Sequence, residues 1–169
     1  MTDPLTSIDP PALLTEAHDA SAFHSGEPVL DDWLRQRAWA NLQAAASRTY
    51  VICPSGARTV AGYASLSMGQ ILARETLGSM PRFIPAVVLG RLAIDHSWQG
   101  KGIGRALLAD VVNRALRAST EVSARLIIVH AISPAAETFY LHHGFARLPV
   151  ETPTFALDLV RIQKLRDSG

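Results

Sequence analysis

The chain has 169 residues, of which 48% are hydrophobic, and a formal net charge of +1 at pH 7. This length supplies one sizeable core, so we expect a single domain over residues 1–169. No apolar run approaches the ~18 residues that a membrane span needs, the start MTDPLTSIDP lacks an export signal, and the single Cys53 cannot form an internal disulfide. These features argue against a membrane-bound or disulfide-built protein and predict a cytoplasmic one.

The first half of the chain predicts a strand, a helix and a hairpin. A short apolar stretch at Ala12–Ala17 predicts the first strand. In the segment 23–47, apolar residues recur at helical spacing after a loop, which predicts one helix with a buried face. Alternation on either side of a Pro-Ser-Gly turn predicts a strand hairpin over Arg48–Met68. The segment Arg74–Pro85 carries a glycine and two prolines and is predicted to be a connector.

The second half alternates strands and helices. The run Ala86–Asp95 is apolar on both faces, as in a central strand. A glycine-rich stretch and an amphipathic helix follow it, and then a buried strand over Ala124–Ile132. Ser133–Phe145 begins with serine and proline and ends at a glycine, which predicts a short helix, and Thr154–Ile162 alternates as a last strand. The order predicts a mixed α/β fold with a mostly antiparallel central sheet flanked by helices.

Three glycines at alternate positions, Gly100, Gly102 and Gly104, lie between the central strand and the following helix. A strand that runs into such a loop and then a helix presents backbone N–H groups and the positive end of a helix dipole to an anion. The Walker loop needs lysine and then serine or threonine after its last glycine, and the dinucleotide fingerprint needs two residues between its second and third glycines. Neither pattern fits, and a glycine-rich turn before an ordinary helix is the simpler alternative.

The pattern Gln99-Gly100-Lys101-Gly102-Ile103-Gly104 resembles the pyrophosphate loop of the GNAT acetyltransferases, which bind acetyl-coenzyme A (acetyl-CoA). VLGRLAID before it and AAETFYLHHGF after it stand where that family places its own signatures. The resemblance implies that Gln99–Arg105 bind the donor's pyrophosphate. It also implies a splayed strand pair that forms the acetyl-CoA cleft, where the backbone of Leu92, Ala93 and Ile94 holds the pantetheine arm and polarises the acetyl carbonyl.

Tyr140 is the predicted catalytic residue, because FYLHHGF resembles the GNAT element whose tyrosine faces the thioester sulfur. When an amine attacks acetyl-CoA, a thiolate leaves whose conjugate acid has a pKa of ~8.5, judged from free cysteine. A phenol with a pKa of ~10 can hydrogen-bond to that sulfur and donate a proton. The alternative is that Phe139 and Tyr140 are core aromatics. His142 and His143 point about 100° apart on a helix, so we expect no metal site there.

The segments FHSGEPVLDDWL, ASRTYVI, VVLGRLAIDHSWQGKGIGRALL and FYLHHGF together resemble the acetyltransferase toxins of bacterial type II toxin–antitoxin modules. That resemblance implies a homodimer that acetylates the α-amine of aminoacyl-tRNA, and a ribbon-helix-helix antitoxin encoded nearby. An α-amine with a pKa of ~7.7–8.0 needs less deprotonation help than a lysine at ~10.4, in keeping with the lack of an obvious acidic base beside the strand. A small amine or a protein N-terminus is the alternative acceptor, and a coenzyme A-binding regulator without turnover is the non-enzymatic alternative.

Arg91 and Trp39 are the remaining candidates for contact with a partner. Arginines scattered along the chain could contact tRNA phosphates, and Arg91, beside the predicted acetyl site, is our candidate for the acceptor end of the substrate. Solvated surface charge is the simpler interpretation of any one arginine. Trp39 lies opposite the stripe Leu30–Leu34–Ala38, so we expect it on an exposed polar face, either at an interface or folded back over the connector.

Overall fold

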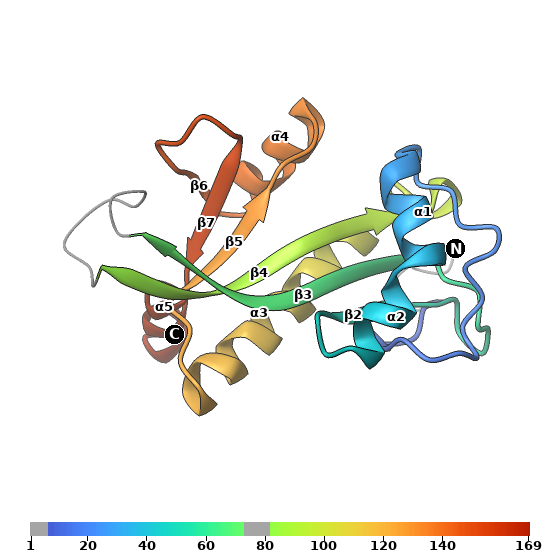
Figure 1. The fold of residues 1–169 in the computed structure, drawn as a ribbon, viewed down its shortest axis with the longest axis horizontal. Helices are drawn as coiled ribbons and strands as arrows, with labels where there is room; N and C mark the ends of the chain where they lie inside the picture. The colour runs from blue at the N-terminus through green and yellow to red at the C-terminus, as the bar shows by residue number, and fades with distance from the viewer. Residues whose placement is uncertain (1–6, 73–81) are drawn as a thin grey trace. The chain divides into compact units, whose positions relative to one another are not determined.

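The computed structural model of the chain describes residues 7–72 and 82–169, and Figure 1 shows its strands and helices. In chain order the elements are β1 (Ala12–Leu13), α1 (Pro28–Gln36), α2 (Ala38–Gln43), β2 (Arg48–Ile52), β3 (Gly62–Leu72), β4 (Phe83–Ile94), the 3-10 helix η3 (His96–Trp98), α3 (Ile103–Glu121), β5 (Leu126–His130), α4 (Pro134–His142), β6 (Ala146–Arg147), β7 (Thr154–Asp158) and α5 (Leu159–Asp167).

The strands of these described residues form one sheet in the order β1-β2-β3-β4-β5-β7-β6. The pairs β1–β2, β2–β3, β5–β7 and β6–β7 are antiparallel, and the pair β4–β5 is parallel. The pairing confirms the predicted mixed α/β fold with a mostly antiparallel sheet.

The chain divides into two compact units, and β3, β4 and α3 each have residues in both. The first unit comprises Met1–Ser67 with Gly90–Val111, and the second comprises Met68–Leu89 with Val112–Gly169. Each unit has its own cluster of buried apolar side chains. The single domain over residues 1–169 stays a prediction.

The first unit is built around α1, whose sequence PVLDDWLRQ places apolar residues on one face. Leu30, Trp33 and Leu34 are buried on that face and join a cluster that includes Phe23 and Tyr63, as an amphipathic helix requires. The Tyr63 hydroxyl donates a hydrogen bond to the Leu30 carbonyl at 2.7 Å. Because Tyr63 belongs to β3, this bond ties the sheet to the helix that covers it.

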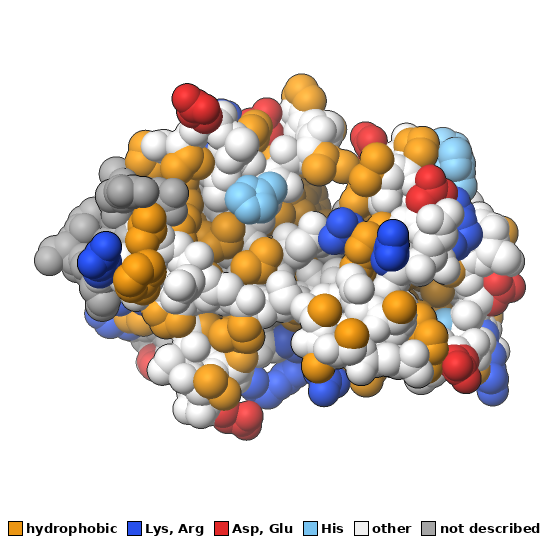
Figure 2. Space-filling view, viewed as in Figure 1, with side chains coloured by type: hydrophobic (Ala, Val, Ile, Leu, Met, Phe, Trp, Pro, Cys, Tyr) orange, Lys and Arg blue, Asp and Glu red, His pale blue; other side chains and the backbone are white. Residues whose placement is uncertain are grey.

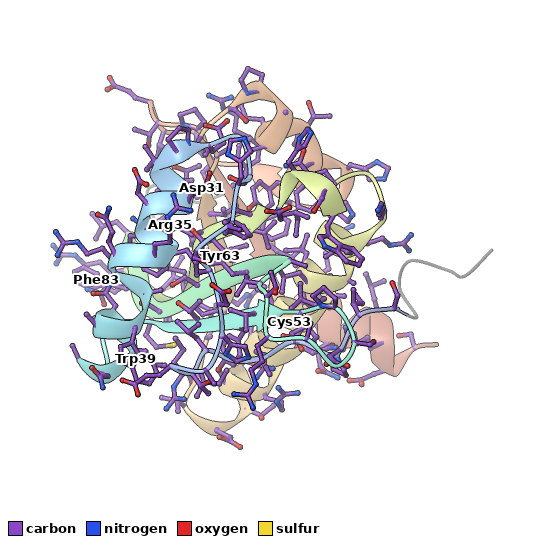
Figure 3. All side chains as sticks on the ribbon, turned by 90° about the vertical axis from the view of Figure 1, so that its right-hand side faces the viewer. Asp31, Arg35, Trp39, Cys53, Tyr63 and Phe83 are labelled. Carbon is purple, nitrogen blue, oxygen red and sulfur yellow. The ribbon has the colours of Figure 1, made fainter. Side chains whose placement is uncertain are left out.

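The predicted single helix of the segment 23–47 is two helices, because α1 ends at Gln36 and α2 begins at Ala38. Arg37 between them has φ −122° and ψ −31°, which departs from helical geometry. Trp39 is half-buried and packs against the hydrophobic cluster of the first unit, and Figure 3 labels it on α2. The prediction of an exposed polar face for Trp39 is therefore wrong: the break in the helix turns its side chain toward the core.

The strands of the first unit follow the predicted hairpin. Arg48 of β2 lies opposite Leu66 of β3, and Ile52 lies opposite Gly62, in antiparallel register. Of the predicted strand Ala12–Ala17, only Ala12 and Leu13 form a strand, β1, and they pair with Val51 and Tyr50 of β2. The hairpin prediction is confirmed, and β3 continues beyond it to Leu72.

In the second unit, β5 and α4 match the predicted buried strand and short helix. β5 pairs with β7 along its whole length, with Leu126 opposite Asp158 and His130 opposite Thr154. α4 begins after Ser133, whose hydroxyl accepts a hydrogen bond from the Ala136 N–H at 3.1 Å. This side-chain cap satisfies one of the free N–H groups of the helix, as expected for serine at that position.

The predicted last strand, Thr154–Ile162, is correct only as far as Asp158, because α5 begins at Leu159. The Asp158 carboxylate accepts hydrogen bonds from the N–H groups of Val160 and Arg161, and this cap starts a helix where alternation suggested a strand. Residues 74–81 of the predicted connector lie outside the described residues, and the connector's last residues, 83–85, belong to β4. No helix in the described part of the chain is long and apolar enough to cross a membrane.

Candidate active site

The glycine loop between η3 and α3 leaves the first turn of α3 open to a ligand. Gly100 and Gly102 have φ of +73° and +81°, a left-handed backbone that glycine adopts without a steric penalty. The Gly102 carbonyl accepts the first helical hydrogen bond, from the Ala106 N–H at 3.1 Å. The N–H groups of the following turn have no acceptor inside the helix, and the helix dipole places positive charge there. This geometry fits the pyrophosphate of acetyl-CoA.

The other residues of the predicted loop differ in their surroundings. Ile103 is 1% exposed and packs with Ile52 and Ala61, which anchors the start of α3 in the first unit. Lys101 and Arg105 are exposed, so their cationic groups are accessible to an anion. The Lys101 ammonium lies 5.1 Å from the centre of the Trp98 ring, a cation–π distance that holds it beside the loop.

Gln99 braces the loop through its side chain. Its amide nitrogen donates to the carbonyls of Ser25 at 2.7 Å and Ile94 at 2.9 Å. Asp95 fixes the preceding turn, because its carboxylate accepts hydrogen bonds from the backbone N–H groups of His24 at 2.9 Å and Ser97 at 3.0 Å. Burial alone would raise the pKa of Asp95, but these hydrogen bonds outweigh it and hold that pKa below its ordinary value. The loop therefore rests on a network of bonds to residues 24 and 25.

β4 runs past the end of its pairing with β5. The last paired residues are Leu89 and Val129, and β4 continues to Ile94. Leu92, Ala93 and Ile94, the predicted donor-binding residues, lie in this extension. Ala93 is buried in the main cluster of the first unit and Ile94 packs against a second one, so their side chains serve packing and their backbone is the part suited to a ligand. The splayed strand pair and its cleft stay predictions.

Arg91 stacks on an aromatic cluster of the first unit. Its guanidinium carbon lies 4.3 Å from the centre of the Trp33 ring, and Trp33 in turn stacks on Tyr63 with ring centroids 6.0 Å apart. Figure 3 shows Tyr63 on β3 near Asp31 and Arg35 of α1. The stacking orients the Arg91 guanidinium without neutralising it, so β4 carries a half-buried, preorganised cation directly before Leu92, where the predicted donor site begins.

Tyr140 lies on α4 in the second unit and is 5% exposed. Its ring makes edge contacts with Phe139 and Phe145, at centroid distances of 5.2 Å and 5.3 Å. Burial raises the pKa of Tyr140 above its ordinary value, because the phenolate would lose its hydration. The phenol therefore keeps its proton at neutral pH, which is the state that donates a hydrogen bond.

The predicted site residues divide between the two units. The loop Gln99–Arg105, the extension Leu92–Ile94 and Arg91 belong to the first unit, and Tyr140 belongs to the second. Their predicted roles stay predictions. Within the described residues, no group of three or more His, Cys, Asp or Glu could hold a metal ion.

Sequence reasoning missed Asp95, which supports the loop through the bonds described above. The signal was present: an aspartate two residues before a serine, directly after a strand, is typical of a side chain that bonds the backbone of its own turn. It missed Tyr63 as well, whose hydroxyl bond and ring contacts depend on tertiary packing that no local pattern carries.

Comparison with known proteins identifies the family. The family model described as the acetyltransferase (GNAT) domain matches residues 46–147. A tRNA-acetylating toxin of Mycobacterium tuberculosis (strain ATCC 25618 / H37Rv) is 36% identical over 151 residues, which are 87% of this chain and 90% of that protein. The chain therefore belongs to the GNAT acetyltransferase family, which confirms the predicted family and class of enzyme.

Solved structures share the fold over nearly the whole chain. AtaT complexed with acetyl-methionyl-tRNAfMet is 28% identical, with a TM-score of 0.88, over 94% of this chain and 99% of that one. A tyrosine-to-phenylalanine mutant of KacT is 27% identical, with a TM-score of 0.87 over the same shares. A tyrosine-to-phenylalanine mutant of the AtaT toxin, bound to the C-terminus of the antitoxin AtaR and acetyl-CoA, is 30% identical, with a TM-score of 0.83 over 95% of this chain and 98% of that one.

Proposed function

We propose that this chain is the toxin of a type II toxin–antitoxin module, and that it transfers the acetyl group of acetyl-CoA to the α-amine of an aminoacyl-tRNA. The observation that carries the proposal is the glycine loop at the open first turn of α3, in a chain 36% identical to a tRNA-acetylating toxin. An acetylated α-amine is no longer a nucleophile for peptide-bond formation, so the product blocks translation.

The donor is held by backbone groups. The N–H groups of the loop and of the first turn of α3 bind the pyrophosphate, and Lys101 and Arg105 add positive charge at the same place. Gln99 keeps the loop in this conformation through its two bonds to backbone carbonyls. Backbone amides in the extension Leu92–Ile94 polarise the acetyl carbonyl, where negative charge develops in the transition state.

The reaction forms one bond and breaks one. The α-amine nitrogen attacks the acetyl carbonyl carbon, a C–N bond forms, and the tetrahedral intermediate collapses with cleavage of the C–S bond. The leaving sulfur takes the phenolic proton of Tyr140, the nitrogen loses its extra proton to water, and water returns a proton to the phenolate. The phenol of Tyr140 is protonated near neutral pH, as a general acid must be. Burial raises its pKa further, which makes it a weaker acid, so it gives up its proton only as negative charge builds on the sulfur.

The acceptor, an aminoacyl-tRNA, carries negative charge on its phosphates, and its reacting group is the α-amine. Arg91, oriented by its stacking on Trp33, binds a phosphate at the acceptor end of the tRNA, since a guanidinium matches phosphate geometry. No strong base is needed, because an α-amine is partly unprotonated near neutral pH.

The partners form a further part of this proposal. AtaT bound to AtaR and acetyl-CoA is a relative with both an antitoxin and the donor, which supports an antitoxin for this chain. We propose that it is a ribbon-helix-helix protein encoded nearby, that the toxin is a homodimer, and that it acts in the cytoplasm, where charged tRNA is used. Co-purification with the product of the neighbouring gene, followed by light scattering of the toxin alone, tests both assemblies.

The test of the function is a labelling experiment. The purified chain is incubated with labelled acetyl-CoA and total charged tRNA, and the RNA is digested to release N-acetyl-aminoacyl-adenosine. Label in that product, absent with Tyr140→Phe, is the expected result. Acetyl-CoA binding without labelled RNA would point to a small amine or a protein N-terminus as acceptor, and binding without transfer to any amine would point to a coenzyme A-binding regulator.

A further inference from the structure

A groove of about 300 Å³ lies in the second unit, between the C-terminal half of α3 and the helix α5. The lining residues from α3 are spaced i, i+3, i+4 and i+7, which places them on one face of that helix. The two from α5 are spaced i and i+3. The six residues are Asn113, Leu116, Arg117, Thr120, Gln163 and Arg166.

The groove has an apolar floor and cationic walls. Leu116 is buried, whereas the other five lining residues are exposed. None of the six is acidic. In the part of the chain that the structure describes, no carboxylate lies within 4 Å of the guanidinium nitrogens of Arg117 or Arg166. Two guanidinium groups therefore line one groove, and neither has an ion-pair partner among the described residues.

The two arginines carry the N–H donors that a ligand in the groove would meet. Arg166 Nη1 donates to Asn113 Oδ1 at 2.8 Å, so this guanidinium is held against α3 and keeps its remaining donors, because the group has five N–H bonds. The Thr120 hydroxyl already donates to the Arg117 carbonyl at 2.8 Å, and the Gln163 amide donates to the Asp167 carboxylate at 2.8 Å. The guanidinium groups, more than the neutral side chains, therefore determine what binds.

Positive charge extends beyond the groove over the same two helices. Residues 112–121 and 159–167 contain five Lys or Arg and two Asp or Glu, in a chain whose formal net charge is +1. Figure 2 shows blue Lys and Arg side chains along the lower edge of the view, where Figure 1 draws α5 and the C-terminal half of α3. A local excess of this kind attracts anions, and salt screens the attraction.

We propose that this groove binds a phosphate group, with the guanidinium groups of Arg117 and Arg166 as its ligands. A guanidinium matches phosphate geometry through two parallel hydrogen bonds. Phosphate oxygens point in more than one plane, so arginines from two helices can bind one phosphate together, whereas a carboxylate presents both oxygens in a single plane. The donor loop and Arg91 belong to the first unit, so the inference does not depend on acetyl transfer.

The phosphodiester backbone of an RNA and a free phosphate ester offer this same chemistry, and a first experiment tests the RNA. Binding of a short RNA duplex is measured by fluorescence anisotropy at several KCl concentrations. The duplex carries no amino acid, so its binding is independent of the proposed acetylation. Arg117→Gln/Arg166→Gln removes the two cations of the groove. The matched control, Arg161→Gln/Lys164→Gln, removes the same charge from exposed positions of α5 outside the groove.

If an RNA phosphate occupies the groove, the groove variant should bind the duplex at least about tenfold more weakly, because charge-assisted hydrogen bonds are lost. The slope of log K against log[KCl] should fall by about 1, as for the loss of one phosphate contact. The control variant should stay within a few fold of wild type and keep the wild-type slope, because it changes only distant charge.

Inorganic phosphate is the probe for the second source. The Nε–Hε NMR signals of Arg117 and Arg166 are expected to shift as phosphate replaces chloride at constant ionic strength, and the signal of Arg161 is expected to stay in place. Such shifts without a groove-dependent loss of RNA affinity would assign the groove to a free phosphate ester. Equal RNA affinity in the two double variants, together with unshifted groove signals, would overturn the proposal.

Arg117→Gln alone separates binding from folding, because it leaves the bond between Arg166 and Asn113 intact. Circular dichroism and thermal unfolding are expected to show wild-type structure and stability, since Arg117 is exposed. The affinity for whichever probe binds the wild-type groove should fall by at least several fold. Wild-type RNA affinity and unchanged phosphate shifts at Arg166 in this variant would show that the two guanidinium groups share no ligand, and would overturn the proposal.

Discussion

Tyr140 must hold its proton until a thiolate begins to leave, and its burial against Phe139 and Phe145 keeps it protonated. Tyr140→Phe removes only the hydroxyl, and the aromatic contacts remain. We expect acetyl-CoA affinity within a few fold of wild type and turnover lower by about 10²–10⁴, the range for general acid–base help. Calorimetry and thiol release measure the two quantities, and wild-type turnover in this variant would remove Tyr140 from the mechanism.

The matched control for that change is Tyr63→Phe, which deletes a buried hydroxyl of the first unit. The Leu30 carbonyl loses its donor, and we expect the free energy of unfolding to fall by about 1–3 kcal/mol, the usual cost of a buried unsatisfied group. Turnover at a temperature where the variant is fully folded should change far less than in Tyr140→Phe. Denaturant unfolding and the same thiol assay distinguish lost stability from lost chemistry.

Gln99 tests whether bracing the loop matters for binding. Gln99→Ala removes the donors to the Ser25 and Ile94 carbonyls, which gives the glycine loop more freedom before the donor binds. At about 0.5–1.5 kcal/mol for each hydrogen bond, we expect acetyl-CoA affinity to fall by about tenfold. Gln43→Ala, at an exposed position of α2, is the control. Equal affinities for the two variants would show that the loop is rigid without its brace.

At the scale of elements, the start of α3 carries the donor site. Gly102→Asp places a side chain and a negative charge at a left-handed position beside the helix N-terminus. We expect no measurable acetyl-CoA binding, because the anion meets a like charge where it needs free N–H groups. Gly56→Asp is the control, since Gly56 has φ +76° in a turn with nothing within 4 Å of an added Cβ. Normal affinity in Gly102→Asp would refute the loop assignment.

The elements also show what local sequence can and cannot predict. The glycine loop, the serine-capped α4 and the β2–β3 hairpin are encoded by residues close together in the chain, and all three were predictable. The break at Arg37 and the burial of Trp39 were not, because packing in the first unit decides them. Leu159–Ile162 was assigned to a strand because its alternation outweighed a single capping residue, Asp158.

At the scale of the whole molecule, stability should fall at both ends of the pH range. Asp95 and Asp158 have pKa values below the ordinary one: burial opposes this, but hydrogen bonds outweigh it, from Ser97 and His24 to Asp95 and from Arg125 to Asp158. Such groups stabilise the fold above their unfolded pKa of about 4, and that stability is lost as the pH falls through their folded values. Tyr63 and Tyr140 have raised pKa values because of burial.

Tyr63 and Tyr140 determine how stability falls at high pH. The unfolded chain releases their protons near pH 10, whereas the folded chain keeps them. We therefore expect the free energy of unfolding to be nearly constant, as far as these groups are concerned, from about pH 5 to 9, and to decrease below about pH 4 and above about pH 10. Denaturant unfolding followed by circular dichroism across this range measures it. Asp158→Asn removes the charge that pairs with Arg125 at 2.9 Å, so the free energy of unfolding should depend less on pH below about pH 4. The control, Asp32→Asn, changes an exposed carboxylate of α1 and should leave that pH dependence unchanged. The same acid slope in Asp158→Asn and wild type would show that the Arg125–Asp158 pair forms without stabilising the second unit.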